Sequence, residues 1–381
     1  MRIAHFINDL DGQGGIETYV ERLGHGLSAA GHEVIYFGRQ GATTDEHFHV
    51  RDAEDLYLQA QGRCVDVLHL HKAVQNVPPD DLPVIRTVHD NGGSCPSGSR
   101  YLSRLGKPCD RTASLATCLF GHYVDGCGSR RPQKVWRNFQ RLANNQRLLP
   151  AIPTIAVSQY LKDEMIALGY PESGIEVVRS PAPDGPSSPT PLRDDVPIRL
   201  LFIGRLVPEK GVDWLLRALS PLPSFVHLDI VGEGHARSTL EAQTEDLGLG
   251  DRVTFHGWIQ QSSLPPFLEA ARAVVVPSVW HEPAGLVPLE AAAYGRPTVV
   301  STVGGLPEYG SLEYALQVPP HDDDALTAAL LQLCTDTNLA TTLGLAGHKA
   351  ARTNFQLSSF IHQHERLYAA LFPQAHDVLP A

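Results

Sequence analysis

The chain has 381 residues, 43% hydrophobic and 19% charged, so it is long enough for two globular domains and too apolar for a disordered polymer. Its formal net charge of −11 argues against non-specific nucleic-acid binding as its main activity. The longest apolar runs have the length of strands, so no transmembrane helix is predicted, and residues 1–8 are too short and polar for a signal peptide. Six cysteines without such a peptide favour a reducing cytoplasm.

Short apolar strands alternate with helical stretches along the whole chain. This alternation is typical of parallel sheets that are covered by helices on both faces. A last helix is predicted near 357–372. The predicted strands are 2–7, 34–37, 65–70, 84–88 and 154–157 in the first half, and 200–203, 226–231, 253–255, 273–276 and 298–301 in the second.

A segment rich in Pro, Ser and Asp, 180–197, separates the two sets of strands and is predicted to be a linker. The chain is therefore expected to be α/β, with two doubly wound, Rossmann-like domains that face each other across a cleft. The first domain is 1–179, with a cysteine-containing insertion at 92–128, and the second is 198–355. Residues 356–381 are expected to form a terminal helix that packs back on the first domain.

Two carboxylates, Glu282 and Glu290, bracket the N-terminus of an Ala-rich helix that follows a predicted strand. Between them, Gly285, Leu286 and Val287 offer backbone N–H groups. A helix N-terminus attracts phosphate, and a carboxylate accepts hydrogen bonds from a diol. The pattern therefore favours a ligand in which a diphosphate is flanked by two sugars.

The first predicted strand runs into a glycine-rich turn that contains Gly14 and Gly15. Glycines let the backbone approach an anionic group closely. The dinucleotide pattern G-x-G-x-x-G fails here, because Glu17 occupies the position of its third glycine. The alternative interpretation is a plain turn between a strand and a helix.

The strand at 200–203 runs into a second glycine turn, which carries Arg205 and Lys210. Arg supplies a bidentate fork and Lys a point charge, and both suit phosphate oxygens. The alternative is a solvated pair of surface charges. His89 ends the strand at 84–88, where it is either a functional group or a histidine satisfied by local hydrogen bonds.

The order of these motifs resembles that of the retaining glycosyltransferases of family 4, which have the GT-B fold. The resemblance spans nearly the whole chain and is more specific in the second domain. It rests on the run from Glu282 to Glu290, the pair Arg205 and Lys210, Gly232-Glu233-Gly234, Gly304-Gly305-Leu-Pro-Glu308, and Gly14-Gly15-Ile-Glu17.

In the second domain, the resemblance implies that Glu290 holds the nucleotide ribose and that Glu282 lies near the donor-sugar hydroxyls. It implies that Arg205 and Lys210 bind the diphosphate and replace a divalent cation, so that catalysis needs no metal. Backbone contacts to the donor sugar and phosphate are implied for Gly285, Leu286 and Val287.

In the first domain, the resemblance places His89 close to the donor sugar and Gly14 and Gly15 against the diphosphate. The implied enzyme is a hexosyltransferase or a related glycosyltransferase. It would use a UDP- or GDP-sugar and a glycan, lipid-linked or small-molecule hydroxyl acceptor, with a role in cell-surface polysaccharide or glycoconjugate synthesis. A non-hydrolysing nucleotide-sugar epimerase and a non-catalytic nucleotide-sugar-binding protein remain alternatives.

The two glutamates are interpreted as diol holders rather than as a nucleophile and an acid. A double-displacement glycosidase needs two carboxylates about 5–5.5 Å apart, whereas these flank a turn and a helix. A front-face substitution, in which the leaving phosphate helps to deprotonate the acceptor, fits the available residues.

Four cysteines fall in the irregular segment 92–128, and none of them forms a C-x-x-C pair. They could form a structural zinc site, remain packing thiols or form disulfides, and the pattern leaves these alternatives open. Cys64 and Cys334 are expected to be buried apolar thiols. The four clustered cysteines are Cys95, Cys109, Cys118 and Cys127.

A basic amphipathic helix is predicted within 128–150, with Val135, Phe139 and Leu142 on one face and Trp136 beside it. Either it contacts an anionic membrane or a lipid-linked acceptor, which would place the protein at the inner face of the membrane, or its apolar stripe lies in the core. The segment has no acidic residue, and its cations are Arg130, Arg131, Lys134, Arg137, Arg141 and Arg147.

Overall fold

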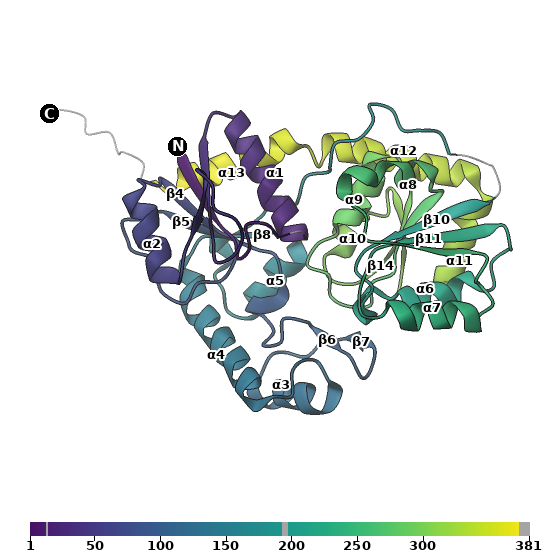
Figure 1. Ribbon diagram of the computed structural model, residues 1–381, viewed down its shortest axis with the longest axis horizontal. Helices are drawn as coiled ribbons and strands as arrows, with labels where there is room; N and C mark the ends of the chain where they lie inside the picture. The colour runs from purple at the N-terminus through teal and green to yellow at the C-terminus, as the bar shows by residue number, and fades with distance from the viewer. Residues whose placement is uncertain (13, 193–196, 373–381) are drawn as a thin grey trace. The chain divides into compact units, whose positions relative to one another are not determined.

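A computed structural model of the chain describes residues 1–12, 14–192 and 197–372 (Figure 1). The chain folds into two compact units, each described by itself. Unit 1 consists of Met1–Pro96, Trp136–Ser180 and the chain from Gln356 onward, and unit 2 consists of Ser97–Val135 and Pro181–Phe355.

Unit 1 is built on a seven-stranded parallel sheet with the order β3-β2-β1-β4-β5-β8-β9. The expected strands are all present, and the short edge strands β3 and β9 are additional. Their parallel pairing confirms the α/β prediction. The bounds are β1 Arg2–Phe6, β2 Glu33–Gly38, β3 His47–His49, β4 Val67–Leu70, β5 Val84–Val88, β8 Thr154–Ala156 and β9 Ile175–Val177.

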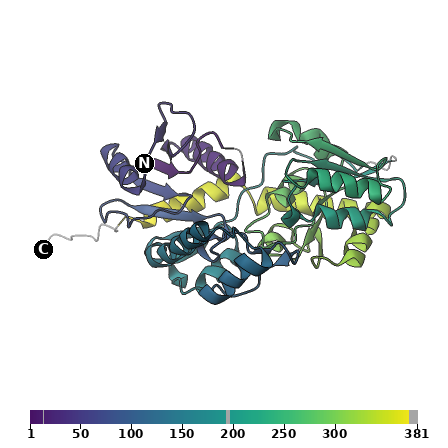
Figure 2. The ribbon, with the colours of Figure 1, turned by 60° about the horizontal axis from the view of Figure 1, so that its bottom comes forward.

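The helices of unit 1 include the last helix of the chain, α13 (Leu357–Ala370), which lies beside α1 (Gly15–Ala29) in both views (Figures 1 and 2). Tyr19 on α1 and His364 on α13 are joined by a hydrogen bond of 3.0 Å between their Oη and Nε2 atoms. Gly26 makes the close packing possible, since a Cβ there would lie 2.3 Å from Cδ1 of Ile361. The remaining helices longer than one turn are α2 Ala53–Gly62, α5 Gln159–Ala167 and most of α4 Pro132–Leu148.

Unit 2 is built on a six-stranded parallel sheet with the order β12-β11-β10-β13-β14-β15. The inner strands β13 and β14 are runs of buried, mostly apolar residues, as expected where helices cover both faces. The strands are β10 Ile198–Ile203, β11 Val226–Val231, β12 Val253–Gly257, β13 Ala273–Val276, β14 Thr298–Ser301 and β15 Ala315–Val318. The helices are α6 Val212–Leu219, α7 Arg237–Asp246, α8 Pro265–Ala270, α9 Leu286–Ala293, α10 Leu306–Tyr309, α11 Asp323–Thr335 and α12 Thr337–Thr353.

The insertion differs from the sequence-based expectation. Residues 97–135 group with unit 2, although the sequence placed 92–128 in the first domain. The physical reason is Tyr101, which is buried in the same hydrophobic cluster as Trp214 and Leu206 of unit 2. The insertion contains a small hairpin, β6 (Tyr101–Leu102) and β7 (Lys107–Pro108), followed by α3 (Leu115–Phe120).

Helix α4, Pro132–Leu148, corresponds to the predicted basic helix. Val135 and Leu142 are buried, so the apolar stripe lies in the protein, as in an ordinary amphipathic helix. Trp136 is 65% exposed. In residues 1–12, 14–192 and 197–372, no helix combines the length and apolar character that a membrane span requires.

Gly211 lies in a crowded left-handed position before α6, with φ of +67°, and a Cβ there would lie 2.0 Å from the carbonyl oxygen of Pro277. Gly248 has nearly the same φ, +66°, but no atom within 4 Å of its Cβ position. We expect Gly248→Ala to cost about 1–2 kcal/mol of unfolding free energy, the price of a left-handed Ala. Gly211→Ala should cost about 1–3 kcal/mol more, because backbone must move.

Urea unfolding of the two variants measures this difference directly. Equal losses of stability would contradict the close approach between the turn after β10 and the end of β13.

Candidate functional site

The order of strands in the sheet of unit 2 reverses between β10 and β13, which are neighbours in the sheet and far apart in the sequence. The loop after β10 carries Arg205 and Lys210, and the loop after β13 carries Glu282. Both loops start at the same carboxyl edge because the strands are parallel. Ligands of open α/β sheets bind at this kind of switch point.

Lys210 and Glu282 form an ion pair in which Nζ lies 2.5 Å from Oε1. The same Oε1 accepts a hydrogen bond of 2.5 Å from Oγ of Ser278. The side chains are only 21% and 9% exposed, and the Lys210 ammonium lies 5.8 Å from the centroid of the Trp280 ring. Removing one partner of such a pair leaves an uncompensated charge in a poorly hydrated place.

The backbone around Glu282 is fixed from both neighbouring loops. Gly304, after β14, has φ of +55°, and a Cβ there would lie 2.3 Å from the Glu282 carbonyl oxygen. That oxygen accepts a hydrogen bond of 2.7 Å from the Gly305 N–H. On the other side, the Val279 N–H donates to the Glu209 carbonyl at 2.9 Å, next to Lys210. Glycine at position 304 is therefore needed for this close backbone approach.

A glycine turn after β11 supports the loop that carries Arg205 and Lys210. A Cβ on Gly232 would lie 1.8 Å from the carbonyl oxygen of Gly204, and one on Gly234 would lie 2.2 Å from that of Leu206. The Leu206 N–H also donates to the Glu233 carbonyl at 2.9 Å. Arg205 itself is exposed at the surface.

Helix α9 begins directly after Gly285, which occupies the N-cap position without a side-chain cap. The first two helical residues, Leu286 and Val287, therefore have N–H groups that no side chain caps, and Pro288 in the third position has none to offer. Glu290, half-buried one turn later, accepts a hydrogen bond of 3.2 Å from Nε2 of Gln261. The helix start thus presents backbone donors near a carboxylate.

The insertion reaches the same loop, a link that the sequence did not predict. Nε2 of His281 lies 2.9 Å from Oδ1 of Asp110, and these residues are 171 positions apart. Asp110 is an ordinary surface aspartate by sequence, so no local pattern could have identified it. His281 immediately precedes Glu282, so the contact joins the insertion to the carboxylate loop.

In unit 1, Gly14 is the N-cap of α1 with an extended backbone, φ −178° and ψ −178°. A Cβ at Gly14 would lie 2.8 Å from Oε2 of Glu17, so glycine keeps this turn compact. Gly15 begins the helix. His89 follows β5 and is half-buried.

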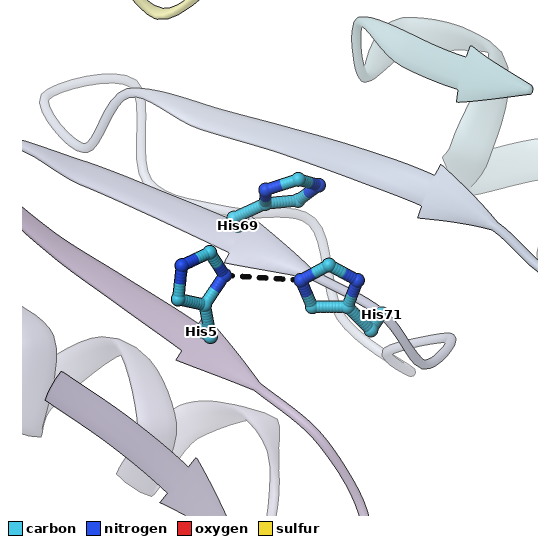
Figure 3. Close-up of side chains that lie close together, drawn as sticks. All are labelled: His5, His69 and His71. Atoms are coloured by element: carbon cyan, nitrogen blue, oxygen red, sulfur yellow. Dashed lines mark hydrogen bonds between the residues drawn. The ribbon is translucent and has the colours of Figure 1, made fainter. Parts of the chain in front are cut away.

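His89 belongs to a chain of histidines on adjacent strands of unit 1. Nδ1 of His5 lies 3.0 Å from Nε2 of His71, and Nδ1 of His71 lies 3.0 Å from Nε2 of His89 (Figure 3 draws the first contact). His5 is on β1, while His71 and His89 directly follow the ends of β4 and β5. The position of His89 in the sequence left open whether it is a functional group or is satisfied by local hydrogen bonds, and its partner His71 was not predicted.

His5, His69 and His71 are also the only described histidine, cysteine or acidic residues that form a group of three with ligand atoms within 4.8 Å of one another. Both nitrogens of His69 already have partners, Oγ1 of Thr87 at 2.7 Å and Oη of Tyr368 at 2.8 Å. The group is therefore a hydrogen-bonded network of neutral imidazoles, and a metal would have to displace these bonds.

The four clustered cysteines do not make such a group in the described residues, so the geometry gives no support to the predicted zinc site. Cys95 is buried, Cys109, Cys118 and Cys127 are partly buried, and none of the four forms a disulfide. The expectation for Cys64 is wrong, because this residue is exposed at a left-handed position with φ of +52°. Cys334 is buried as expected, and burial raises the pKa of its thiol to about 12.

Burial lowers the pKa of the clustered histidines of unit 1, which are those of the hydrogen-bonded network and the neighbouring His364. The pKa falls to about 3 for His5 and His89 and to about 4 for His364. For His69 and His71 the pKa lies well below its ordinary value, since burial is reinforced by the neighbouring imidazoles. His89 is therefore neutral at physiological pH and can act there as a neutral hydrogen-bonding group.

Two family models match consecutive parts of the chain. The model described as Glycosyltransferase Family 4 matches residues 13–183. The model described as Glycosyl transferases group 1 matches residues 197–336, which contain Lys210, Glu282 and Glu290.

Several relatives match the chain over part of its length. The lipopolysaccharide core biosynthesis glycosyltransferase LpsD of Rhizobium meliloti is 39% identical over 154 residues, which cover 40% of this chain and 44% of that protein. A GDP-mannose-dependent alpha-(1-6)-phosphatidylinositol monomannoside mannosyltransferase of Mycolicibacterium smegmatis is 35% identical over 167 residues, 41% of this chain and 44% of its own. The chain spans between 36% and 51% of the length of three similar relatives.

Solved structures match nearly the whole chain. Sucrose-phosphate synthase from Thermosynechococcus elongatus has a TM-score of 0.72 at 23% identity and covers 97% of this chain and 99% of its own. Anabaena HepE in complex with UDP and glucose has a TM-score of 0.70 at 18% identity, with 97% and 100% covered. This likeness confirms the predicted GT-B fold.

The histidine network predicts a loss of stability in acid. The unfolded chain binds protons below the ordinary histidine pKa of 6.5, whereas native His5 resists protonation down to about 3. Stability is therefore fully present above pH 6.5 and falls as the pH drops, by about 1.4 kcal/mol per pH unit for each buried histidine. Urea unfolding between pH 7.5 and pH 4.5 measures this slope.

His5→Gln should reduce the dependence of the unfolding free energy on pH by the contribution of one buried histidine, about 1.4 kcal/mol per pH unit. The matched control is His25→Gln, because His25 is exposed on α1. A slope that is the same in both variants would show that His5 does not contribute as a buried neutral group.

Proposed function

We infer the activity from the family, since the chain belongs to the glycosyltransferases and combines a family 4 domain with a group 1 domain. We propose that the protein transfers a sugar from a nucleotide diphosphate sugar to a hydroxyl acceptor and retains the anomeric configuration. The observation that carries this proposal is the Lys210–Glu282 pair, which lies at the switch point of a parallel sheet.

Lys210 and Arg205 are proposed to hold the donor diphosphate. An ammonium group has three N–H donors. One lies against Glu282, which leaves the others for phosphate oxygens. The exposed guanidinium of Arg205 adds a planar fork suited to a phosphate. Together they would neutralise the charge that develops as the diphosphate leaves, the role for which other enzymes use a divalent cation.

Glu282 is proposed to bind the donor sugar, and Glu290 the ribose. In the described residues, the side-chain hydrogen bonds of Glu282 involve only Oε1, so Oε2 is available to a sugar hydroxyl. The backbone N–H groups of Leu286 and Val287 at the start of α9 would face developing negative charge on the donor. The carboxylate of Glu290, half-buried on α9, would accept hydrogen bonds from the ribose diol.

The same contacts make Glu282 a poor nucleophile. Its Oε1 accepts from two donors, and Lys210 compensates its charge. We therefore favour a front-face substitution. The bond from the anomeric carbon to the phosphate oxygen breaks, and a bond to the acceptor oxygen forms on the same face. The acceptor proton passes to the leaving phosphate oxygen.

In the family 4 domain, the resemblance assigns His89 to the donor sugar and Gly14 and Gly15 to the diphosphate. Burial keeps the pKa of His89 at about 3, so its imidazole would contribute a neutral hydrogen bond rather than a proton.

The acceptor class follows from relatives rather than from geometry. LpsD is a lipopolysaccharide core biosynthesis enzyme, and the mycobacterial relative uses GDP-mannose on a phosphatidylinositol mannoside. HepE was solved with UDP and glucose. We propose a UDP- or GDP-sugar donor and a glycan or lipid-linked acceptor in cell-surface glycan synthesis.

Product stereochemistry tests the reaction. A thermal-shift screen over UDP-, GDP- and ADP-sugars first identifies the donor, because a bound ligand raises the melting temperature. The product formed from that donor is then examined by proton NMR. We expect the anomeric configuration of the donor in the product, and an inverted centre would rule out the front-face mechanism. Epimerised donor without an acceptor would instead indicate an epimerase.

Two substitutions separate the roles within the site. Lys210→Gln should lower kcat by about 10²–10³-fold, the usual loss when a group that stabilises transition-state charge is removed. Glu290→Gln should mainly raise the donor KM by roughly 10- to 100-fold, which corresponds to one charged hydrogen bond of about 1.5–3 kcal/mol.

The matched controls are Lys349→Gln on α12 and Glu245→Gln on α7, which remove the same charges at exposed positions. They should leave both constants unchanged. Wild-type kinetics in Lys210→Gln and Glu290→Gln would refute the assignment of the donor site.

A further inference from the structure

The insertion, 97–135, has an open surface depression of about 720 Å³ that the proposed transfer reaction does not use. Its lining includes three arginines, Arg104, Arg130 and Arg131, and two serine hydroxyl groups, Ser103 and Ser129. Loop residues from both ends of the insertion, which are far apart in the sequence, thus meet around one opening. We call this the arginine pocket.

The charge of the arginine pocket is not neutralised by nearby carboxylates. The insertion has seven Lys and Arg residues against two Asp residues, although the whole chain has a net charge of −11. Asp125 pairs with Arg111 at 2.5 Å, and Asp110 contacts His281. In the described part of the chain, none of the pocket's three arginines forms an ion pair.

The position of Arg104 is fixed by the opposite wall. Its Nη1 donates to the Val124 carbonyl at 2.9 Å, and its backbone N–H donates to the Asp125 carbonyl at 3.0 Å. Gly126, with φ of +74°, completes this turn, and a Cβ there would lie 3.2 Å from Cγ of Arg104. Arginine has five N–H donors, so most of the Arg104 fork remains for a ligand.

Three arginines beside one open depression suit an anion with several oxygens. Arginine binds phosphate through paired, parallel N–H···O bonds, and two serine hydroxyls can add further donors. A free carboxylate would leave most of these donors without partners. The chemistry of the lining therefore favours a phosphate group.

The surroundings of the arginine pocket are apolar. Leu105 is 52% exposed and follows Arg104, while Tyr123 and Val124, 42% and 45% exposed, precede the Asp125–Gly126 turn. Leu115 and Phe120 on α3 are also among the exposed large hydrophobic residues. Such a concentration of exposed apolar side chains in a short segment marks an interaction surface. A water-soluble phosphate would gain nothing from these side chains.

We propose that the arginine pocket binds the phosphate headgroup of an anionic phospholipid at a bilayer surface. Arg104, Arg130 and Arg131 contact the phosphate, and Leu105, Tyr123 and Val124 enter the apolar boundary beneath the headgroups. This arrangement of cations beside exposed aromatic and aliphatic residues is the chemistry of interfacial binding. The bilayer contact is made by the loops of the insertion, not by the apolar stripe of α4, which is buried.

Sedimentation of the full chain with lipid vesicles tests the proposal, and the assay contains neither a sugar donor nor an acceptor. The protein should bind vesicles of phosphatidylcholine with phosphatidylglycerol, and should bind pure phosphatidylcholine only weakly. R130Q/R131Q should weaken binding to the anionic vesicles roughly thirtyfold, since each cation near the surface contributes about fivefold. The control R137Q/R147Q removes the same charge from exposed positions of α4 outside the pocket and should have little effect.

An equal loss in the two double variants would mean that binding is a property of the basic segment as a whole and would overturn the pocket. Y123S/V124S, which keeps every charge, should also weaken binding, and an unchanged affinity would remove the bilayer contact. Stabilisation by inorganic phosphate without vesicle binding would identify a free phosphate as the ligand and contradict the lipid.

Lipid binding by the arginine pocket and the proposed sugar transfer can be refuted independently of each other. Vesicle binding requires no sugar transfer, and R130Q/R131Q leaves Lys210, Glu282 and Glu290 intact. Transfer to a water-soluble acceptor without vesicles should therefore be the same in this variant and in the wild type, whereas transfer to a lipid-linked acceptor in anionic vesicles should fall.

Discussion

The buried ion pair between Lys210 and Glu282 constrains much of the local structure of unit 2. Two charges of low exposure are stable together only if their geometry is well defined and further hydrogen bonds satisfy them. That requirement fixes the loops after β10 and β13 relative to each other. The close approach of Gly211 to Pro277 serves this purpose, since a side chain at Gly211 would separate these two loops, while a side chain at Gly304 would push the loop after β14 away from Glu282.

The insertion is joined to the same loop, but by interactions of a different kind. Tyr101 is buried in the core of unit 2, where its ring contributes stability. The contact between Asp110 and His281 is weaker as an energy, because the Asp110 side chain is 83% exposed and exposed pairs contribute at most about 1 kcal/mol. The contact between Asp110 and His281 therefore holds the insertion in position but adds little to stability.

The sequence predicted what depends on local patterns. Continuous apolar runs identified the inner strands, and spacing around Glu282 and Glu290 identified the start of α9 and the donor-site candidates. It failed where distant residues decide the structure. The burial of Tyr101 depends on a cluster about a hundred residues away, so the insertion was placed in the wrong half. Cys64 has an apolar thiol but lies at an exposed turn, and the histidine partners of His89 come from strands whose pairing is not visible in the chain.

The poorly exposed titratable groups differ between the two units: unit 2 has an ion pair, whereas unit 1 has hydrogen-bonded histidines of lowered pKa. In unit 2, Lys210 and Glu282 form an ion pair at low exposure. In unit 1, burial lowers the pKa of His89 to about 3, and His71 and His5 extend the same neutral chain inward. A neutral His89 carries no positive charge, so it would offer a departing phosphate a hydrogen bond but no compensating charge. In the proposed reaction, the charge of the phosphate must be stabilised by Lys210 and Arg205, and the acceptor proton must go to the phosphate itself.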